Sequence, residues 1–264
     1  MGVLSGEGGA VNGESTVDLW EVQDFTDPTE GVFSNTRFGV DQGCGVKDWF
    51  GWFTSKVHTA ARFPGEDFTF TGNLGNGKGF TGTAICDAIQ VAAEIERGQY
   101  IQCLTRFSCN GIPTHGTAVA TDSTDPDPPC SQGMGVKLDG ESVGEVAYWR
   151  FTIQARNKTR VTGSTGGYRF RKAGPITGQF EYKFYYDDPA VLPAKDSIYV
   201  VAFDVTSTTY WEWTWGKITR VHQHWGANEE DPPYAIVRGV FKPFSGTSIG
   251  SIITPAGTTK WPSA

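Results

Sequence analysis

Residues 9–22 read GAVNGESTVDLWEV and residues 135–151 read GVKLDGESVGEVAYWRF, so a short pattern recurs after the midpoint of the chain. The Gly-Glu-Ser triplets begin 127 positions apart, at Gly13 and Gly140. The tryptophans that follow, Trp20 and Trp149, lie 129 positions apart. In each copy a glycine turn precedes a run of apolar residues near period two, which is typical of a hairpin followed by a strand. Ordered matches at nearly one spacing predict a tandem duplication with domain-sized copies.

Further matches follow in the same order. Residues 51–56 (GWFTSK) align with residues 178–183 (GQFEYK), and residues 63–67 (FPGED) align with residues 192–196 (LPAKD). Near the end of each copy the matches are looser, and these are Arg106, Phe107 and Gly111 with partners near Phe241 and Gly246.

A proline-rich segment lies between the copies. Residues 113–130 hold four prolines and three aspartates and have no hydrophobic period. Proline cannot continue a strand ladder, and the residue before it is forced toward extended backbone. We therefore predict a first domain over residues 1–111, an extended linker over 112–132, and a second domain with a C-terminal tail over 133–264.

The composition favours strands and tight turns. The chain of 264 residues has 34 Gly and 14 Pro but also 13% aromatic residues, which argues against disorder. Residues 197–205 form a β-branched and aromatic run, and residues 210–215 (YWEWTW) alternate strictly. Closing strands are expected at residues 100–107 and 234–241. The predicted fold class is mainly β, with two tandem antiparallel β-sandwich or barrel-type domains.

Two segments do not fit this pattern clearly. Residues 84–97 (AICDAIQVAAEIER) have apolar residues at helical spacing, and Gly98 could cap a helix there. If the two copies share a fold, however, this segment must be a strand. The prediction therefore allows one short helix per domain. The glycines between Gly72 and Gly82 predict a turn or loop.

The cysteines and the apolar segments bear on the expected location. Five cysteines, an odd number with no CxxC pair, are expected to be free thiols in a reducing compartment. No stretch approaches the roughly 20 apolar residues of a membrane helix, and residues 1–7 do not resemble a secretory signal. We expect assembly in a cytoplasm and no membrane partner.

Charge is distributed unequally between the copies. Residues 1–111 have 7 basic and 14 acidic residues, whereas residues 133–264 have 15 basic and 12 acidic residues, within a net charge of −7. This asymmetry favours contact between unlike copies, and ordinary drift in surface charge is the alternative. The acidic balance disfavours sequence-specific nucleic-acid binding. The basic run at residues 169–172 (RFRK) is the exception, and contact with the acidic copy would explain it equally well.

No motif predicts chemistry, so we expect no enzyme and no catalytic, cofactor-binding or metal residue. His222 and His224 could share a strand face with a third ligand among Glu229, Glu230 or Asp231, but a plain edge-strand pair is favoured. Residues 75–79 (GNGKG) lack the order of a phosphate loop, and neither a Gly-x-Ser-x-Gly elbow nor HExxH is present. One tryptophan cluster could stack on sugars, although a core or interface role is favoured, and its members are Trp211, Trp213, Trp215 and Trp225.

The pattern of strands and turns resembles the tail tube (major tail) proteins of long-tailed bacteriophages. The features that carry the resemblance are the opening hairpin, the Pro64-Gly65 turn, the strands Val17–Val22 and Gly51–Lys56, and their counterparts Val146–Phe151 and Gly178–Lys183. The resemblance implies stacked six-membered rings whose inner strands close a β-barrel. A tandem-duplicated chain would make such a ring as a homotrimer.

The resemblance also implies partners and a location. These are other copies of the chain and other tail proteins of the virion. Genomic DNA would pass through a mostly acidic lumen without specific binding. The segments 1–9 and 252–264, together with the linker, would join neighbouring rings. Alternatives are a capsid decoration protein, a hub or neck ring protein, and a carbohydrate-binding module that uses the tryptophans.

Overall fold

The computed structural model is mainly β, as predicted, and every ladder between its named strands is antiparallel. The residues that the structure describes are 2–11, 14–15, 17–27, 32–33, 40–41, 45–56, 63–75, 77–117, 130–161, 167–188, 191–225, 232–241, 250–254 and 257–261.

The first half of the chain forms one set of paired strands, which we call the first repeat. Its strands pair in the order β4–β7–β10–β9–β8–β2–β3, with the small β5–β6 hairpin between β4 and β7 in the chain. The strands are β2 (Gly9–Val11), β3 (Glu14–Ser15), β4 (Leu19–Asp27), β5 (Val32–Phe33), β6 (Val40–Asp41), β7 (Val46–Lys56), β8 (Asp67–Gly75), β9 (Lys78–Glu94) and β10 (Gln102–Cys109).

The second half forms the second repeat, and its pairing order is the same. The order is β14–β17–β20–β19–β18–β12–β13, with the β15–β16 hairpin between β14 and β17 in the chain. The strands are β12 (Val136–Leu138), β13 (Glu141–Ser142), β14 (Glu145–Ala155), β15 (Lys158–Arg160), β16 (Phe170–Lys172), β17 (Ile176–Tyr185), β18 (Ile198–Asp204), β19 (Tyr210–His224) and β20 (Tyr234–Phe241).

The remaining strands extend the two repeats. β11 (Thr114–Thr117) pairs with the start of β9, and β21 (Gly250–Thr254) takes the same place on β19 and carries β22 (Gly257–Trp261). β1 (Gly2–Glu7) pairs with the edge of β4 that β7 leaves free. Thus β11 lies inside the predicted linker and is paired, which differs from the expected extended connector. Residues 118–129 lie outside the described part, and the division into two domains stays a prediction.

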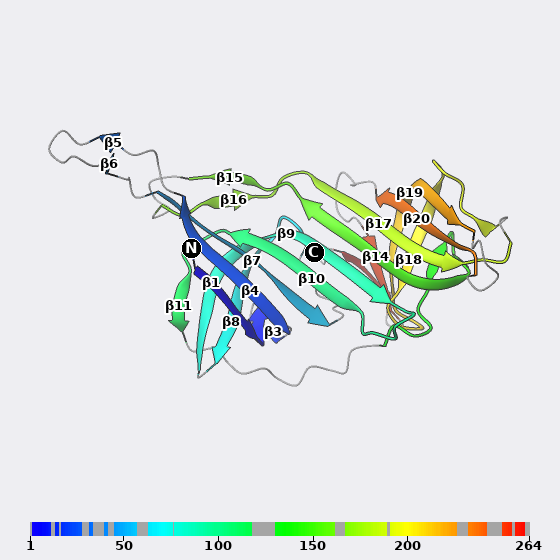
Figure 1. Cartoon of the computed structure of the whole chain (residues 1–264), viewed down its shortest axis with the longest axis horizontal. Helices are drawn as coiled ribbons and strands as arrows, with labels where there is room; N and C mark the ends of the chain where they lie inside the picture. Colours follow the sequence, from blue (N-terminus) through cyan, green and yellow to red (C-terminus); the bar gives the residue numbers. More distant parts are fainter. Residues whose placement is uncertain are drawn as a thin grey trace.

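The repeats are joined into one sheet. The second half of β9 pairs with β14, so strands follow one another across the molecule from β1 on the left to β19 on the right (Figure 1). One face of this sheet covers the core, and we call the other the open face.

Aromatic side chains fill the core. Phe70 and Phe107 have ring centroids 4.8 Å apart in the first repeat, and Trp213 and Phe241 have centroids 4.2 Å apart in the second. The buried residues of both repeats form one contiguous cluster. Burying an aromatic or large aliphatic side chain contributes roughly 1.5–3 kcal/mol, so these rings dominate the stability.

The segment with helical spacing, Ala84–Arg97, is a strand as far as Glu94, so the helix alternative is wrong. The cause is a β-bulge at Asp87. Arg106 lies opposite Ala88 and Phe107 opposite Cys86, which leaves Asp87 without a partner in the ladder. Cys86 faces the core before the bulge and Ile89 faces it afterwards, so the apolar phase shifts and imitates a helix.

The glycine-rich segment is also mostly strand rather than loop. Only the turn between β8 and β9 interrupts it, where Gly75 and Gly77 have positive φ. Gly72 lies within β8 at a position that has no room for a side chain, because a Cβ there would come within 2.4 Å of the Trp20 ring. Gly82 makes room for Trp49 in the same way, at 2.6 Å.

Ladder registers refine the match between the repeats. Gly51 lies opposite Phe107 and Gly178 lies opposite Phe241, so the expected match of the two glycines holds. Val22 lies opposite Gly51 and Ile153 opposite Gly178. By the same register Trp20 corresponds to Phe151, so the expected match with Trp149 is wrong by two residues. A two-residue difference keeps both side chains on the core face.

Candidate functional site: the junction between the repeats and its free counterpart

The repeats meet along a backbone ladder, which we call the junction. Seven residue pairs join β9 to β14, from Glu94 opposite Tyr148 to Ala88 opposite Gln154. Ile89, Val91 and Ala93 are buried beneath it. Such a ladder gives a fixed register between the repeats.

A hairpin of the second repeat reinforces the junction. Figure 1 shows β15 and β16 reaching from the second repeat toward β7 of the first. There Arg171 holds Asp48 through Nη1 to Oδ1 at 2.9 Å and Nη2 to Oδ2 at 2.6 Å, and Arg169 Nη1 adds a contact of 3.0 Å. Asp48 is buried. The basic run at residues 169–172 therefore contacts the acidic copy within the chain. A contact with the acidic copy was one of the two interpretations of this run, and nucleic-acid binding was the other.

Electrostatics at this contact favour the charged form of Arg171. Burial opposes the charge on Arg171, but hydrogen bonds and attraction from Asp48 outweigh it and raise the pKa of the guanidinium. A two-pronged arginine–carboxylate pair also fixes orientation.

The bulge residue Asp87 forms a second polar contact across the junction. Asn157 Nδ2 donates to Asp87 Oδ1 at 2.7 Å and to the Cys86 carbonyl at 3.1 Å, and the Ser108 hydroxyl also donates to Asp87. Burial raises the pKa of Asp87 in spite of these donors. The bulge therefore turns a carboxylate toward the second repeat.

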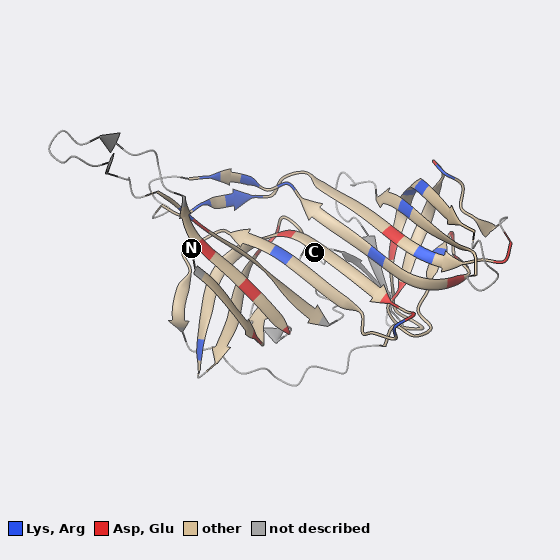
Figure 2. Ribbon diagram, viewed as in Figure 1, with Lys and Arg blue, Asp and Glu red and all other residues tan. Residues whose placement is uncertain are grey.

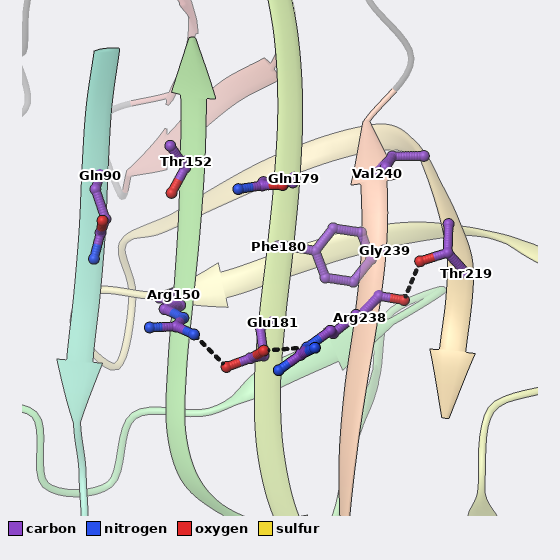
Figure 3. Close-up of a pocket in the computed structure, with 10 residues that line it drawn as sticks. All are labelled: Gln90, Arg150, Thr152, Gln179, Phe180, Glu181, Thr219, Arg238, Gly239 and Val240. Atoms are coloured by element: carbon purple, nitrogen blue, oxygen red, sulfur yellow. Dashed lines mark hydrogen bonds and ion pairs between the residues drawn. The ribbon is translucent and has the colours of Figure 1, made fainter. Parts of the chain in front are cut away.

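The open face is hollowed into a trough. One depression of about 540 Å³ lies over β14, β17 and β20, and a neighbouring one of about 590 Å³ lies over β7, β10 and β9. Gln90, Thr152 and Gln179 line both, so the two are continuous. The lining of the first is drawn in Figure 3.

One carboxylate pairs with two arginines in this trough and offsets one of their two charges. Glu181 accepts from Arg150 Nη2 at 2.7 Å, and Arg238 Nε donates to its other oxygen (Figure 3). Tyr148 Oη also donates to Glu181, at 2.9 Å. Burial would raise the pKa of Glu181, but hydrogen bonds from Arg238 and Tyr148 and both positive charges hold it below the usual value. Glu181 is therefore ionised at neutral pH.

Among the described residues, the second repeat has an unpaired edge where the first has the junction. β18 pairs with β19 only as far as Ile198 opposite Lys217, and β20 covers the other edge. Within the described part of the chain, no strand pairs with Thr219–His224 on the β18 side, and we call this stretch the free edge of β19. On β9 the corresponding stretch carries β14.

The histidines of the predicted pair are side chains of this free edge. The His224 ring stacks on Tyr234 at a centroid distance of 4.7 Å, and His222 lies beside Arg220, Ile236 and Arg238. Glu229, Glu230 and Asp231 lie outside the described residues. Among the described residues, no group of three or more His, Cys, Asp or Glu is arranged to hold a metal.

The tryptophan cluster divides between core and surface. Trp211 and Trp213 are buried, in agreement with the favoured core or interface role, and Trp215 is half-buried. Trp225 is 57% exposed and packs edge-on against Tyr186. The buried pair is not accessible to a sugar ring.

The cysteines that the structure describes are unbridged, and Cys44 lies outside that part. Cys86, Cys103 and Cys109 are buried and Cys130 is exposed. Burial raises the pKa of Cys103 and of Cys109 to about 11, which makes both thiols poor nucleophiles. No helix in the described ranges has the length and apolar character needed to cross a bilayer.

The residues that form the junction carried no sequence signal of their own. Asp48, Asp87 and Glu181 belong to no motif, and only the basic run at 169–172 and the charge asymmetry pointed to a contact between repeats. No protein-family model and no curated protein sequence matches the chain.

Proposed function

We propose that this protein is a structural subunit of a bacteriophage tail tube, in which three copies form a pseudo-sixfold ring and rings stack into a hollow conduit for DNA. One observation carries the proposal: two repeats with one pairing order are joined edge to edge through β9 and β14, and the equivalent edge of β19 is unpaired within the described residues. Repeating the junction between chains adds repeats head to tail, and such a contact forms a ring when its rotation closes after six repeats.

The hairpins support the same arrangement. Within the chain, β15–β16 reaches onto the first repeat and holds Asp48. The equivalent hairpin β5–β6 lies at the far left of Figure 1, away from both sheets. In a ring it would reach the second repeat of the next chain.

The trough supports a conduit lined by this face. Amide and hydroxyl side chains contribute to its lining, and Glu181 pairs with both Arg150 and Arg238 and offsets one of their two charges. In a lumen of this kind Glu181 would weaken the attraction of the arginines for a polyanion, which favours sliding over capture. The protein does no chemistry in this role.

Electron microscopy and native mass spectrometry of the purified protein across a concentration series test the proposal. We expect hollow tubes or stacked rings with six lobes, and ring masses that are multiples of three times 28.7 kDa. Monomers alone at high concentration, or rings with another number of chains, would overturn it. Isolated trimers that bind a capsid lattice would favour the decoration alternative instead.

A further inference from the structure

We infer that the N-terminal strand β1 is a removable cap, and that the free edge of β19 from a second copy takes its place on β4 during assembly. This inference rests on the proposed ring and deepens it, because it names the two surfaces that meet and the segment that must leave. The occupant of the β19 edge is thus another copy of this chain.

The place of β1 is the place of the junction. In the second repeat, β14 pairs with β17 on one edge and directly with β9 on the other. In the first repeat, β4 pairs with β7 on one edge and with β1 on the other. β1 therefore occupies the edge that a neighbouring repeat needs.

β1 is held by fewer buried side chains than β9 is at the junction. β9 contributes the buried side chains Ile89, Val91 and Ala93 to the junction. β1 contributes only Leu4, which is partly buried, and its Val3 is 57% exposed. Six backbone pairs are lost when β1 leaves, and pairing with the free edge of β19 would replace those at Leu19, Trp20 and Glu21, so the exchange restores part of the backbone hydrogen bonding.

Ladder registers predict which residues would meet. In each repeat one phenylalanine lies opposite a glycine, Phe107 in the first and Phe241 in the second. Leu104 lies three positions before Phe107 and opposite Gln90, and Arg238 lies three positions before Phe241 and opposite Arg220. Arg220 therefore corresponds to Gln90, whose junction partner is Thr152. Thr152 precedes Ile153 as Glu21 precedes Val22, so Arg220 would lie opposite Glu21 of the next chain.

Charge at the two edges is complementary. The free edge presents Arg220, which is exposed, beside Arg238 on β20. β4 presents Glu21, and Figure 2 shows acidic positions on β4 and basic positions on the second repeat. Opposite charges directly across a ladder stabilise it, whereas like charges oppose pairing.

A disulfide that locks β1 onto β4 tests the cap. Ser5 lies directly opposite Glu21, a spacing that a cross-strand disulfide can bridge. In a Cys44→Ser/Cys130→Ser background, oxidised Ser5→Cys/Glu21→Cys protein should lose tube formation and regain it on reduction. The matched control is Thr54→Cys/Leu104→Cys, which locks the opposed strands β7 and β10 and should assemble when oxidised.

Cross-linking between chains tests the new pair. Arg220→Cys and Glu21→Cys proteins, made separately in the same background and mixed, should form a disulfide-linked dimer as tubes form. Using Ser207→Cys, at an exposed position between β18 and β19, in place of Arg220→Cys should abolish the dimer. Tubes that form with β1 locked, or without this cross-link, overturn the inference and leave the ring proposal standing. Absence of any assembly in the unmodified protein overturns both.

Discussion

Single buried charges at the junction contribute more to stability than exposed charges do. Asp48 is 1% exposed and is the common partner of Arg169 and Arg171. Exposed pairs such as Lys217–Asp196 have the same formal charges but are surrounded by water, which screens them. The energetic weight of an ion pair here depends on burial and on the number of its hydrogen bonds.

Replacing Asp48 by Asn should therefore destabilise the protein strongly. The guanidinium of Arg171 would stay buried without its counter-charge, a situation that costs about 3–5 kcal/mol. Urea unfolding followed by tryptophan fluorescence measures the loss. Asp196→Asn is the control, and it should cost less than about 1 kcal/mol because that pair is exposed. Equal losses in the two variants would contradict this account.

Glu181 sets how strongly the trough attracts DNA. Glu181→Gln removes the carboxylate shared by Arg150 and Arg238, so the net charge of these three positions rises from +1 to +2. We expect the variant to bind duplex DNA several-fold more tightly than the wild type at low salt, with a steeper dependence on salt concentration. Fluorescence anisotropy with a labelled duplex measures both.

A second glutamate separates this effect from net charge. Glu212→Gln makes the same charge change on β19 outside the trough lining and should leave DNA binding unchanged. If both variants bind DNA equally, the position of Glu181 in the trough is irrelevant, and Glu181 does not weaken DNA binding through its contacts with Arg150 and Arg238.

At the scale of elements, hairpins and alternating strands were predictable because their signals are local. The β2–β3 and β12–β13 hairpins, and the closing strands β10 and β20, follow from turn residues and period-two runs. β9 was ambiguous because the Asp87 bulge depends on the opposing strand β10, which a local pattern does not contain. Junction contacts such as Arg171 with Asp48 join residues 123 positions apart and leave no local signal.

The glycines of β8 and β9 misled the prediction for a related reason. Gly72 is a strand residue because Trp20 fills the space where its side chain would be. Gly72→Ala should therefore destabilise the protein by about 1–3 kcal/mol through overpacking. Thermal unfolding measures it. Gly135→Ala, where the nearest atom to a new Cβ is Asp204 Oδ2 at 3.4 Å, should be nearly neutral. A neutral Gly72→Ala would mean that the Trp20 ring can move.

The two long strands β9 and β19 should differ in amide exchange. Residues 88–92 of β9 are paired on both edges, whereas Thr219–His224 of β19 pairs with β20 alone among the described strands. In dilute protein, hydrogen–deuterium exchange should be slow throughout the β9 segment and fast at those β19 amides that do not face β20. After assembly the β19 segment should become as protected as β9. Continued fast exchange in tubes would show that this edge is not an interface.

At the scale of the whole molecule, the sequence indicated a duplication and an uneven charge distribution, and the fold relates the two. The acidic first repeat and the basic second repeat meet inside the chain at the junction, where the hairpin arginines reach Asp48. Around a ring of identical chains the same contact would recur between an acidic repeat and a basic repeat. Each chain is then complementary to the next at both of its ends.

Assembly should accordingly weaken as salt is added. Raising NaCl from about 0.05 M to about 0.5 M shortens the screening length to a few ångströms, so attraction between unlike repeats falls. We expect the protein concentration at which tubes first sediment to rise several-fold over this range. Arg220→Gln should raise that concentration at low salt and flatten its dependence on salt, since one contributor to the attraction is gone. A threshold that stays constant or falls with salt would mean that apolar burial and backbone pairing alone drive assembly, and that the charge asymmetry of the repeats is incidental.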